Sequence, residues 1–263
     1  MINTEMRGGL IMRDPRKTLL VEGIVNSMVK IHVDGEENYT RVEELLAEGH
    51  GVSEVSNHAS MGDAPLNVLA KKQSGHRRLS RREAFILGVR LMNGSTTNFL
   101  SDAYNHVPIY PQVLDAETNE ERSFAMRLAK ESIPGVEKVR EQQRVLVLYP
   151  EGTRSATGEM ARGNATASHY IKPGRGRDTY VLPVAVEGAF EFYPRQREKV
   201  PYIRIPRWDI YVRVGEPINM TEVAEELKGD GEIKQKMVDR VMQPVADLLP
   251  ERMRGFYRNS VLR

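Results

Sequence analysis

Short apolar runs that alternate with amphipathic segments constrain this sequence more than any other feature. Four runs have the length and apolar composition of a strand, 107–110, 144–149, 181–186 and 210–214, and the more polar 51–56 is a plausible strand. Segments with apolar residues at helical spacing stand around them: 42–47, 64–72, 123–131 and 233–245. Strands that alternate with helices are typical of a parallel sheet covered by helices. We therefore predict an α/β fold with a mixed, mostly parallel central sheet flanked by helices on both faces.

The two ends of the chain are predicted to be helical. Near the N-terminus, apolar residues recur at helical spacing, at Leu20, Ile24, Met28 and Ile31. Residues 18–31 should therefore form one amphipathic helix within an accessory N-terminal segment, 1–31. This helix either packs on its own domain or contacts a membrane or a partner, and the pattern leaves both open. A last helix is expected over 232–249, with a kink at Pro244.

Domain organisation follows from the absence of a linker. No low-complexity tract or internal repeat separates two units, so we expect one domain over 1–263. Residues 84–92 fit a helix or a buried strand, because an apolar run of this length does not distinguish the two. No apolar run reaches the roughly 18 residues of a membrane span, and no signal-peptide core is present. These features predict a cytoplasmic chain whose membrane contact, if it has one, is peripheral.

Composition excludes several kinds of chemistry. The sequence has no cysteine, which rules out a disulfide framework, a thiolate nucleophile and a cysteine-ligated metal. Its six histidines lack ligand spacing, so no metal site is predicted. No G-x-S-x-G, P-loop or H-E-x-x-H sequence occurs. The sequence therefore argues against a serine hydrolase, a kinase and a metalloprotease.

A histidine and an aspartate stand five positions apart at the end of the first predicted strand. His58 and Asp63 would lie about 140° apart on a continuous helix, so they can meet only if the chain turns between them. Asn57 and Ser60 are suited to support such a turn. A histidine held by a carboxylate is a general-base unit. The alternative is structural, because Asp63 is also a good N-cap for the following helix.

A second motif follows the strand 144–149. Tyr149-Pro150-Glu151-Gly152-Thr153-Arg154 lies at the carboxyl end of that strand, where open α/β sheets bind ligands. Thr153 and Arg154 supply a hydroxyl and a guanidinium suited to phosphate. The alternative is an ordinary turn with a surface arginine.

The two motifs in this order resemble those of the glycerophospholipid acyltransferase family, the glycerol-3-phosphate and lysophosphatidate acyltransferases. Asn57-His58 with Asp63, followed some 90 residues later by Tyr149-Pro150-Glu151-Gly152-Thr153-Arg154, carry the likeness. Two weaker blocks, 181–186 and 212–218, are also similar to family blocks, so the resemblance spans roughly 30–220.

The resemblance implies an O-acyltransferase of phospholipid synthesis. His58 would take a proton from an acceptor hydroxyl as it attacks an acyl thioester, with Asp63 orienting the ring and no covalent intermediate. The acceptor, lysophosphatidate or glycerol 3-phosphate, would be held by Glu151, Gly152, Thr153 and Arg154. Arg162 stands where the family usually has a lysine. The donor would be acyl-coenzyme A or an acidic acyl-carrier protein, with no bound cofactor. Backbone N–H groups of the two turns are candidates for binding the oxyanion.

One feature departs from the family pattern. The family's middle block normally ends in a basic residue that holds the phosphate, but no Lys or Arg occurs from Leu91 to Glu121. Other groups could replace it: Arg154, Arg162, Lys172, His106 and the basic run within 71–82. Alternatively, the acceptor is not a glycerol phosphate.

The charges are unevenly distributed along the chain. The 38 basic and 36 acidic residues give a net charge of +2, yet 71–90 holds seven basic residues and one acid. This basic run is predicted to be a surface for the acyl donor or an anionic membrane: Lys71, Lys72, Arg77, Arg78, Arg81 and Arg82. It could also be only a solvated face. No nucleic-acid partner is expected, because the run lacks interleaved aromatic residues.

A non-catalytic protein on the same fold is the rival class. Such a chain would bind an acyl carrier, a lipid or RNA. The presence of Asn57, His58 and Asp63 together favours an enzyme.

Overall fold

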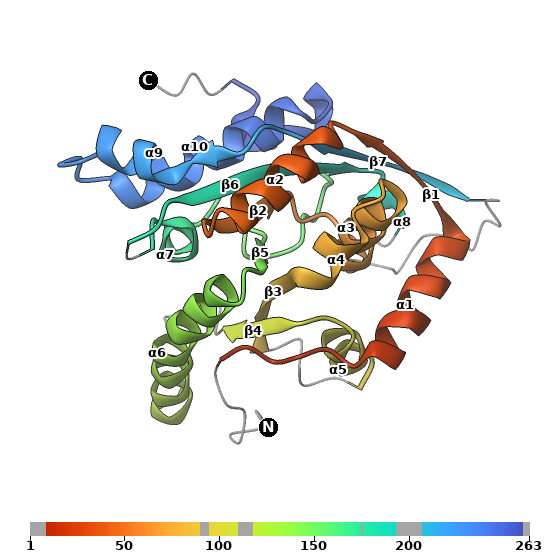
Figure 1. The fold of residues 1–263 in the computed structure, drawn as a ribbon, viewed down its shortest axis with the longest axis horizontal. Helices are drawn as coiled ribbons and strands as arrows, with labels where there is room; N and C mark the ends of the chain where they lie inside the picture. Colours follow the sequence, from red (N-terminus) through yellow and green to blue (C-terminus); the bar gives the residue numbers. More distant parts are fainter. Residues whose placement is uncertain (1–8, 90–94, 110–117, 175, 193–206, 260–263) are drawn as a thin grey trace.

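The computed structural model describes residues 9–89, 95–109, 118–174, 176–192 and 207–259. In this part of the chain eight strands form one sheet, whose path has the order β1-β7-β6-β2-β5-β3-β4, with β8 paired to β6 (Figure 1). The strands are β1 (Val29–Asp34), β2 (Gly51–Ser56), β3 (Glu83–Gly88), β4 (His106–Ile109), β5 (Val145–Leu148), β6 (Thr179–Glu187), β7 (Trp208–Val214) and β8 (Ile218–Asn219).

The sheet is mixed and mostly parallel, as predicted. β6, β2, β5, β3 and β4 are parallel neighbours, and β1 is parallel to β7. The pairing of β7 with β6 is antiparallel, as is that of β8 with β6. The carboxyl ends of the five parallel strands from β6 to β4 therefore share one edge of the sheet, and their amino ends share the opposite edge.

Helices cover both faces of the sheet, which confirms the second part of the fold prediction (Figure 1). On one face lie α1 (Pro15–Met28), α2 (Glu37–Ala47), α3 (Asp63–Gln73), α4 (Arg77–Arg82) and α5 (Ser95–Asp102). On the other lie α6 (Asn119–Glu141), α7 (Ser168–Ile171), α9 (Met220–Glu226) and α10 (Ile233–Asp247). The short α8 (Ala189–Phe192) follows β6, and 3₁₀ turns occupy Ala165–Ala167, Glu251–Met253 and Gly255–Tyr257.

Alternation of side chains separates the two cores. In β5, Val145 and Val147 face the core under α1–α5, whereas Leu146 and Leu148 face the opposite side. This period of two is the geometry of an extended strand. It also determines which polar residues of the strands share the face covered by α3.

The N-terminal segment differs from the prediction of one helix over 18–31. The helix ends at Met28, and β1 begins at Val29. Val29, Ile31 and Val33 alternate with polar residues, and β1 pairs with β7 along its whole length. Backbone pairing with β7 thus overrides the helical spacing of Ile31.

Two other segments are more clearly defined in the structure than in the sequence. β3 covers residues 84–88 of the ambiguous run 84–92, so this part of the run is a strand. The helix predicted over 123–131 is the middle of the 23-residue α6. Within the described ranges, no helix combines the length and apolar character needed to cross a bilayer.

Candidate active site

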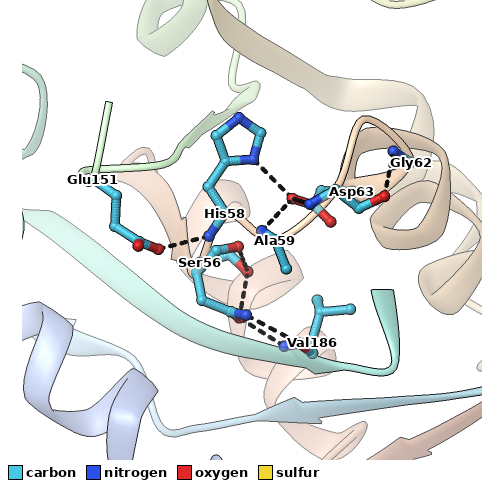
Figure 2. A network of polar contacts seen from close by, with 9 residues as sticks. Ser56, His58, Ala59, Gly62, Asp63, Glu151 and Val186 are labelled. Carbon is cyan, nitrogen blue, oxygen red and sulfur yellow. Dashed lines mark hydrogen bonds and ion pairs between the residues drawn. The ribbon is translucent and has the colours of Figure 1, made fainter. Parts of the chain in front are cut away.

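His58 and Asp63 meet in the turn between β2 and α3, although five positions separate them. His58 Nδ1 lies 2.8 Å from Asp63 Oδ2 (Figure 2). The carboxylate is buried, whereas a fifth of the His58 side chain is exposed. An ionised carboxylate only accepts hydrogen bonds, so Nδ1 donates and Nε2 remains an acceptor. Figure 2 shows Nε2 directed away from Asp63. The pair therefore has the geometry of a general base.

Backbone amides fix the Asp63 carboxylate. Oδ2 also accepts the N–H groups of Ala59 and Ser60, each at 2.9 Å, and the Ser60 hydroxyl accepts the Gly62 N–H at 2.9 Å. Three donors therefore converge on one oxygen of Asp63. Because the amides of Ala59, Ser60 and Gly62 hold the turn, they are not the oxyanion donors that the sequence left as candidates.

Asn57 secures the turn to the neighbouring strand. Its side-chain amide donates to the Val186 carbonyl at 2.9 Å, and its side-chain oxygen accepts the Val186 N–H at 2.8 Å (Figure 2). These two bonds replace a pair of ladder bonds where β2 ends. The supporting position of Asn57 and Ser60 in the turn thus has a direct structural basis.

Glu151 joins the two motifs from within the protein. One carboxylate oxygen accepts the His58 N–H at 2.7 Å and the other accepts the Ala161 N–H at 2.8 Å. Burial raises the pKa of Glu151 to about 7, although these two amides oppose the rise. The sequence suggested that Glu151 binds the acceptor. In the structure its carboxylate is buried and accepts these two backbone amides, so it links the two loops, and the residue also lines the depression described below.

Tyr149 was not assigned a role from the sequence, but it contacts the His58 ring. The two rings stack with centroids 4.4 Å apart and an interplanar angle of 18°. Burial raises the pKa of Tyr149 well above its ordinary value, and the nearby Asp63 charge adds to the rise. The signal for this contact was the position of Tyr149 at the carboxyl end of β5, directly beside β2 in the sheet.

Part of the second motif lines a depression of about 270 Å³. Gly152 adopts φ +71°, a left-handed conformation that favours glycine. Thr153 and Arg154 line the depression beyond it. Arg162 lies outside it, with its guanidinium 2.6 Å from Asp239 and 4.9 Å from the ring of Phe256, which lines the depression.

The basic run does not form one surface, contrary to the sequence-based prediction. Lys71 is fully buried between Glu54 at 2.7 Å and Glu83 at 2.6 Å. A lysine without these carboxylates would be exposed, but two buried acids favour an ion pair inside the protein. Lys72 is paired with Glu22. Neither lysine is available as part of an open cationic patch.

The four arginines of the run are exposed, but they lie at the other edge of the sheet from His58. Arg77, Arg78, Arg81 and Arg82 belong to α4, which leads into the amino end of β3. His58 and Glu151 follow the carboxyl ends of β2 and β5.

Two further candidates for the acceptor phosphate also lie at the amino edge. Lys172 precedes β6, and the buried His106 begins β4, with its Nδ1 3.0 Å from the Tyr104 carbonyl. Of the replacement groups named from the sequence, Arg154 and Arg162 are those on the His58 side. The carboxyl end of the predicted middle block, 110–112, lies outside the described residues.

Together these features describe an α/β fold with a carboxylate-held histidine at the carboxyl edge of its sheet. The sequence model of the Acyltransferase family matches residues 30–187, more than half of the chain. The chain belongs to the Acyltransferase family, and acyl transfer is the activity of its class.

A solved structure supports the fold. The chain is similar to the crystal structure of the 1-acyl-sn-glycerophosphate (LPA) acyltransferase, PlsC, from Thermotoga maritima, with a TM-score of 0.50 and 20% sequence identity. The alignment covers 90% of this chain and 84% of that one. A comparison with curated proteins finds no match.

Proposed function

We propose that the chain transfers a fatty acyl group from a thioester to a hydroxyl of a glycerol-phosphate-type acceptor, lysophosphatidate or glycerol 3-phosphate, in phospholipid synthesis. The observation that carries this proposal is the 2.8 Å contact between His58 Nδ1 and Asp63 Oδ2, which leaves Nε2 as the proton acceptor. The donor is acyl-coenzyme A or an acyl-carrier protein, and no cofactor is bound.

The reaction needs one proton carrier and no enzyme nucleophile. His58 Nε2 takes the proton of the acceptor hydroxyl as its oxygen attacks the thioester carbonyl carbon. The tetrahedral intermediate collapses with cleavage of the C–S bond, and the imidazolium returns the proton to the leaving thiolate. Asp63 holds the tautomer and stabilises the transient imidazolium.

The acceptor phosphate is best served by Arg154, with Arg162 as a second cation. Arg154 lines the depression that begins at Glu151, so a phosphate there lies beside the loop braced against His58. Arg162 already pairs with Asp239, which lowers its availability. Both residues come from the loop that follows β5.

Replacement of His58 tests the assignment of the base. His58→Ala should lower kcat by about 10²-fold or more with intact folding. His32→Ala is a matched control, because His32 also has a carboxylate partner, Asp209 at 2.8 Å, and a stacked tyrosine, Tyr211. Wild-type rates in His58→Ala, or an equal loss in His32→Ala, would contradict the proposal.

A second candidate function is acyl transfer to an acceptor without a glycerol phosphate. The absence of Lys and Arg from Leu91 to Glu121 favours it. Thioester consumption, measured with glycerol 3-phosphate, lysophosphatidate and unphosphorylated alcohols, distinguishes the two acceptor classes. The same assay with coenzyme A and carrier-protein thioesters identifies the donor. A chain that binds these compounds but consumes no thioester would be the non-catalytic rival.

We also propose that the protein binds the face of an anionic membrane. The support is α1, on which Leu19, Leu20, Ile24 and Met28 are each 45–70% exposed. An apolar helix face next to cations is suited to the interface between lipid tails and headgroups. A peripheral position on the cytoplasmic face would bring the enzyme to lipid acceptors.

A further inference from the structure

The buried side of α3 carries an unusual polar stripe. Asp63, Asn67 and Lys71 are spaced four residues apart, so they lie on one face of the helix. All three are at most 1% exposed. The buried face of a helix is normally apolar, and a fully buried lysine is rare unless it is paired.

The sheet presents a matching row of polar side chains beneath this stripe. Glu54 in β2 is opposite Val147 in β5, and Tyr149 follows two positions later on the same face. Ser56 follows Glu54 on the same face of β2, and His58, which comes after the end of the strand, stacks on Tyr149. The row therefore leads from Glu54 through Tyr149 to His58.

Each member of the stripe lies near a member of the row. Asp63 binds His58 at 2.8 Å. Asn67 is near enough to Tyr149 to oppose part of the rise in its pKa, but neither the Asn67 amide nor the Tyr149 hydroxyl has a hydrogen-bond partner among the described residues. Lys71 lies 2.7 Å from Glu54 and 2.6 Å from Glu83, the first residue of β3.

The ion cluster is better explained by positioning than by stability. Two carboxylates share one ammonium group, and a buried ion pair often contributes no net stability relative to apolar residues. Glu54 and Glu83 stand on strands that flank β5, so Lys71 is held from both sides. A shift or rotation of α3 would break both contacts. Asp63 is on the same rigid helix, about 12 Å from Lys71 along the helix axis. The contacts that hold Lys71 against the sheet therefore also determine the position of Asp63.

We propose that Lys71, with Glu54 and Glu83, and the ring of Tyr149 are positioning elements that hold Asp63 and the His58 ring in the arrangement needed for the base. Lys71 fixes the helix that carries Asp63, and Tyr149 fixes the plane of the imidazole from the side of the sheet. This role rests on the proposed function of His58.

Variants of Tyr149 separate the stacked ring from the hydroxyl. Tyr149→Leu removes the stacking and should lower kcat by about 10- to 100-fold, with the KM of both substrates nearly unchanged. Tyr149→Phe keeps the ring and should stay within about threefold of wild type. Tyr211→Leu is the control, because Tyr211 stacks on His32 at 4.7 Å in the same way.

A spectroscopic measurement tests positioning without any acyl transfer. In protein labelled with ¹⁵N at histidine, the His58 Nδ1–H signal, assigned by its loss in His58→Ala, should be one sharp resonance in wild type and Tyr149→Phe. It should broaden or disappear in Tyr149→Leu. An unchanged signal together with wild-type kcat in Tyr149→Leu would overturn the role of Tyr149. If no substrate is turned over by any variant, the proposed function fails while this signal still tests the positioning.

The ion cluster is tested by a neutral replacement. The triple variant Glu54→Gln/Lys71→Met/Glu83→Gln removes all three charges and avoids an unpaired one. We expect it to fold, with kcat reduced at least tenfold and a heterogeneous His58 signal. A folded triple variant with wild-type kcat and one sharp His58 signal would refute the positioning role of the ion cluster. If it does not fold, Glu83→Gln alone, which leaves the Lys71–Glu54 pair, is measured instead. We expect a smaller reduction of kcat and a smaller change in the His58 signal than in the triple variant.

Discussion

At the scale of single residues, Glu151 is the link between the turn that carries His58 and the loop that follows β5. Its two oxygens accept backbone N–H groups from His58 and Ala161. Glu151→Ala should remove the acceptor of the part-buried His58 N–H, which costs about 1 kcal/mol. We expect lower unfolding free energy in urea and a reduced kcat, with a smaller effect in Glu151→Gln, which keeps one acceptor. Wild-type values for both quantities in Glu151→Ala would contradict the bracing role.

The two arginines near the depression differ in position, because Arg154 lines it and Arg162 lies outside it, and this difference predicts unequal effects. Arg154→Ala should raise the KM for a phosphorylated acceptor about tenfold and leave the KM for the thioester unchanged, because a charged hydrogen bond contributes about 1.5–3 kcal/mol. Arg162→Ala should have a smaller effect, since that guanidinium binds Asp239. Arg240→Ala, which removes an exposed arginine paired with Glu226, is the control. An unchanged acceptor KM in Arg154→Ala would remove it from the phosphate site.

At the scale of the elements, the ion cluster between α3 and the sheet should make stability depend on pH. Burial raises the pKa of Glu83 to about 7, although Lys71 opposes the rise. A carboxyl whose folded pKa is raised holds its proton more tightly in the folded state, so stability decreases as the pH rises from about 4.5 to 7. Each pKa unit corresponds to about 1.4 kcal/mol.

Glu83→Gln should remove this contribution. The unfolding free energy of the variant, relative to wild type, should therefore increase between pH 5 and pH 8 in urea titrations. Glu151 titrates over the same range in both proteins, so the difference isolates Glu83. Glu44→Gln, on the exposed side of α2, should give a difference that does not change with pH. Parallel curves for Glu83→Gln and wild type would contradict the prediction.

The elements also show what local sequence could predict. β5, β6 and β7 were predictable because short aliphatic runs between turn residues have few alternatives. β2 is more polar, and its end before Asn57 and His58 indicated where His58 and Asp63 could meet. β1 was missed because Ile31 continues the helical spacing of α1, although Val29, Ile31 and Val33 also alternate. The burial of Lys71 was not predictable from neighbouring residues. It depends on Glu54 and Glu83, which only the folded sheet brings to one lysine.

At the scale of the whole molecule, the exposed apolar residues and the exposed arginines share one helical layer. Among the residues whose side chains the structure describes, five of the eight large exposed hydrophobic residues lie in 12–28. Partial burial lowers the pKa of Arg144, and the positive charges of Arg13, just before α1, and Arg82, in α4, lower it further. The three cations are therefore close together. Lys72 of α3 pairs with Glu22 of α1, which joins the helices of this layer.

Vesicle binding tests whether this layer is the membrane face. The protein should cosediment with vesicles of phosphatidylcholine and phosphatidylserine more than with phosphatidylcholine alone. Burial of a Leu or Ile side chain contributes about 1.5–3 kcal/mol, so Leu20→Ser/Ile24→Ser should weaken binding by about tenfold or more. An arginine near an anionic surface contributes about 1 kcal/mol, so Arg77→Glu/Arg78→Glu should weaken binding only to the anionic vesicles.

Ile133→Ser, which changes an exposed residue of α6 on the other face, should bind like wild type. If neither double variant lowers vesicle binding, the α1–α4 layer is not the membrane face. If Ile133→Ser weakens binding instead, the α6 side of the sheet faces the bilayer.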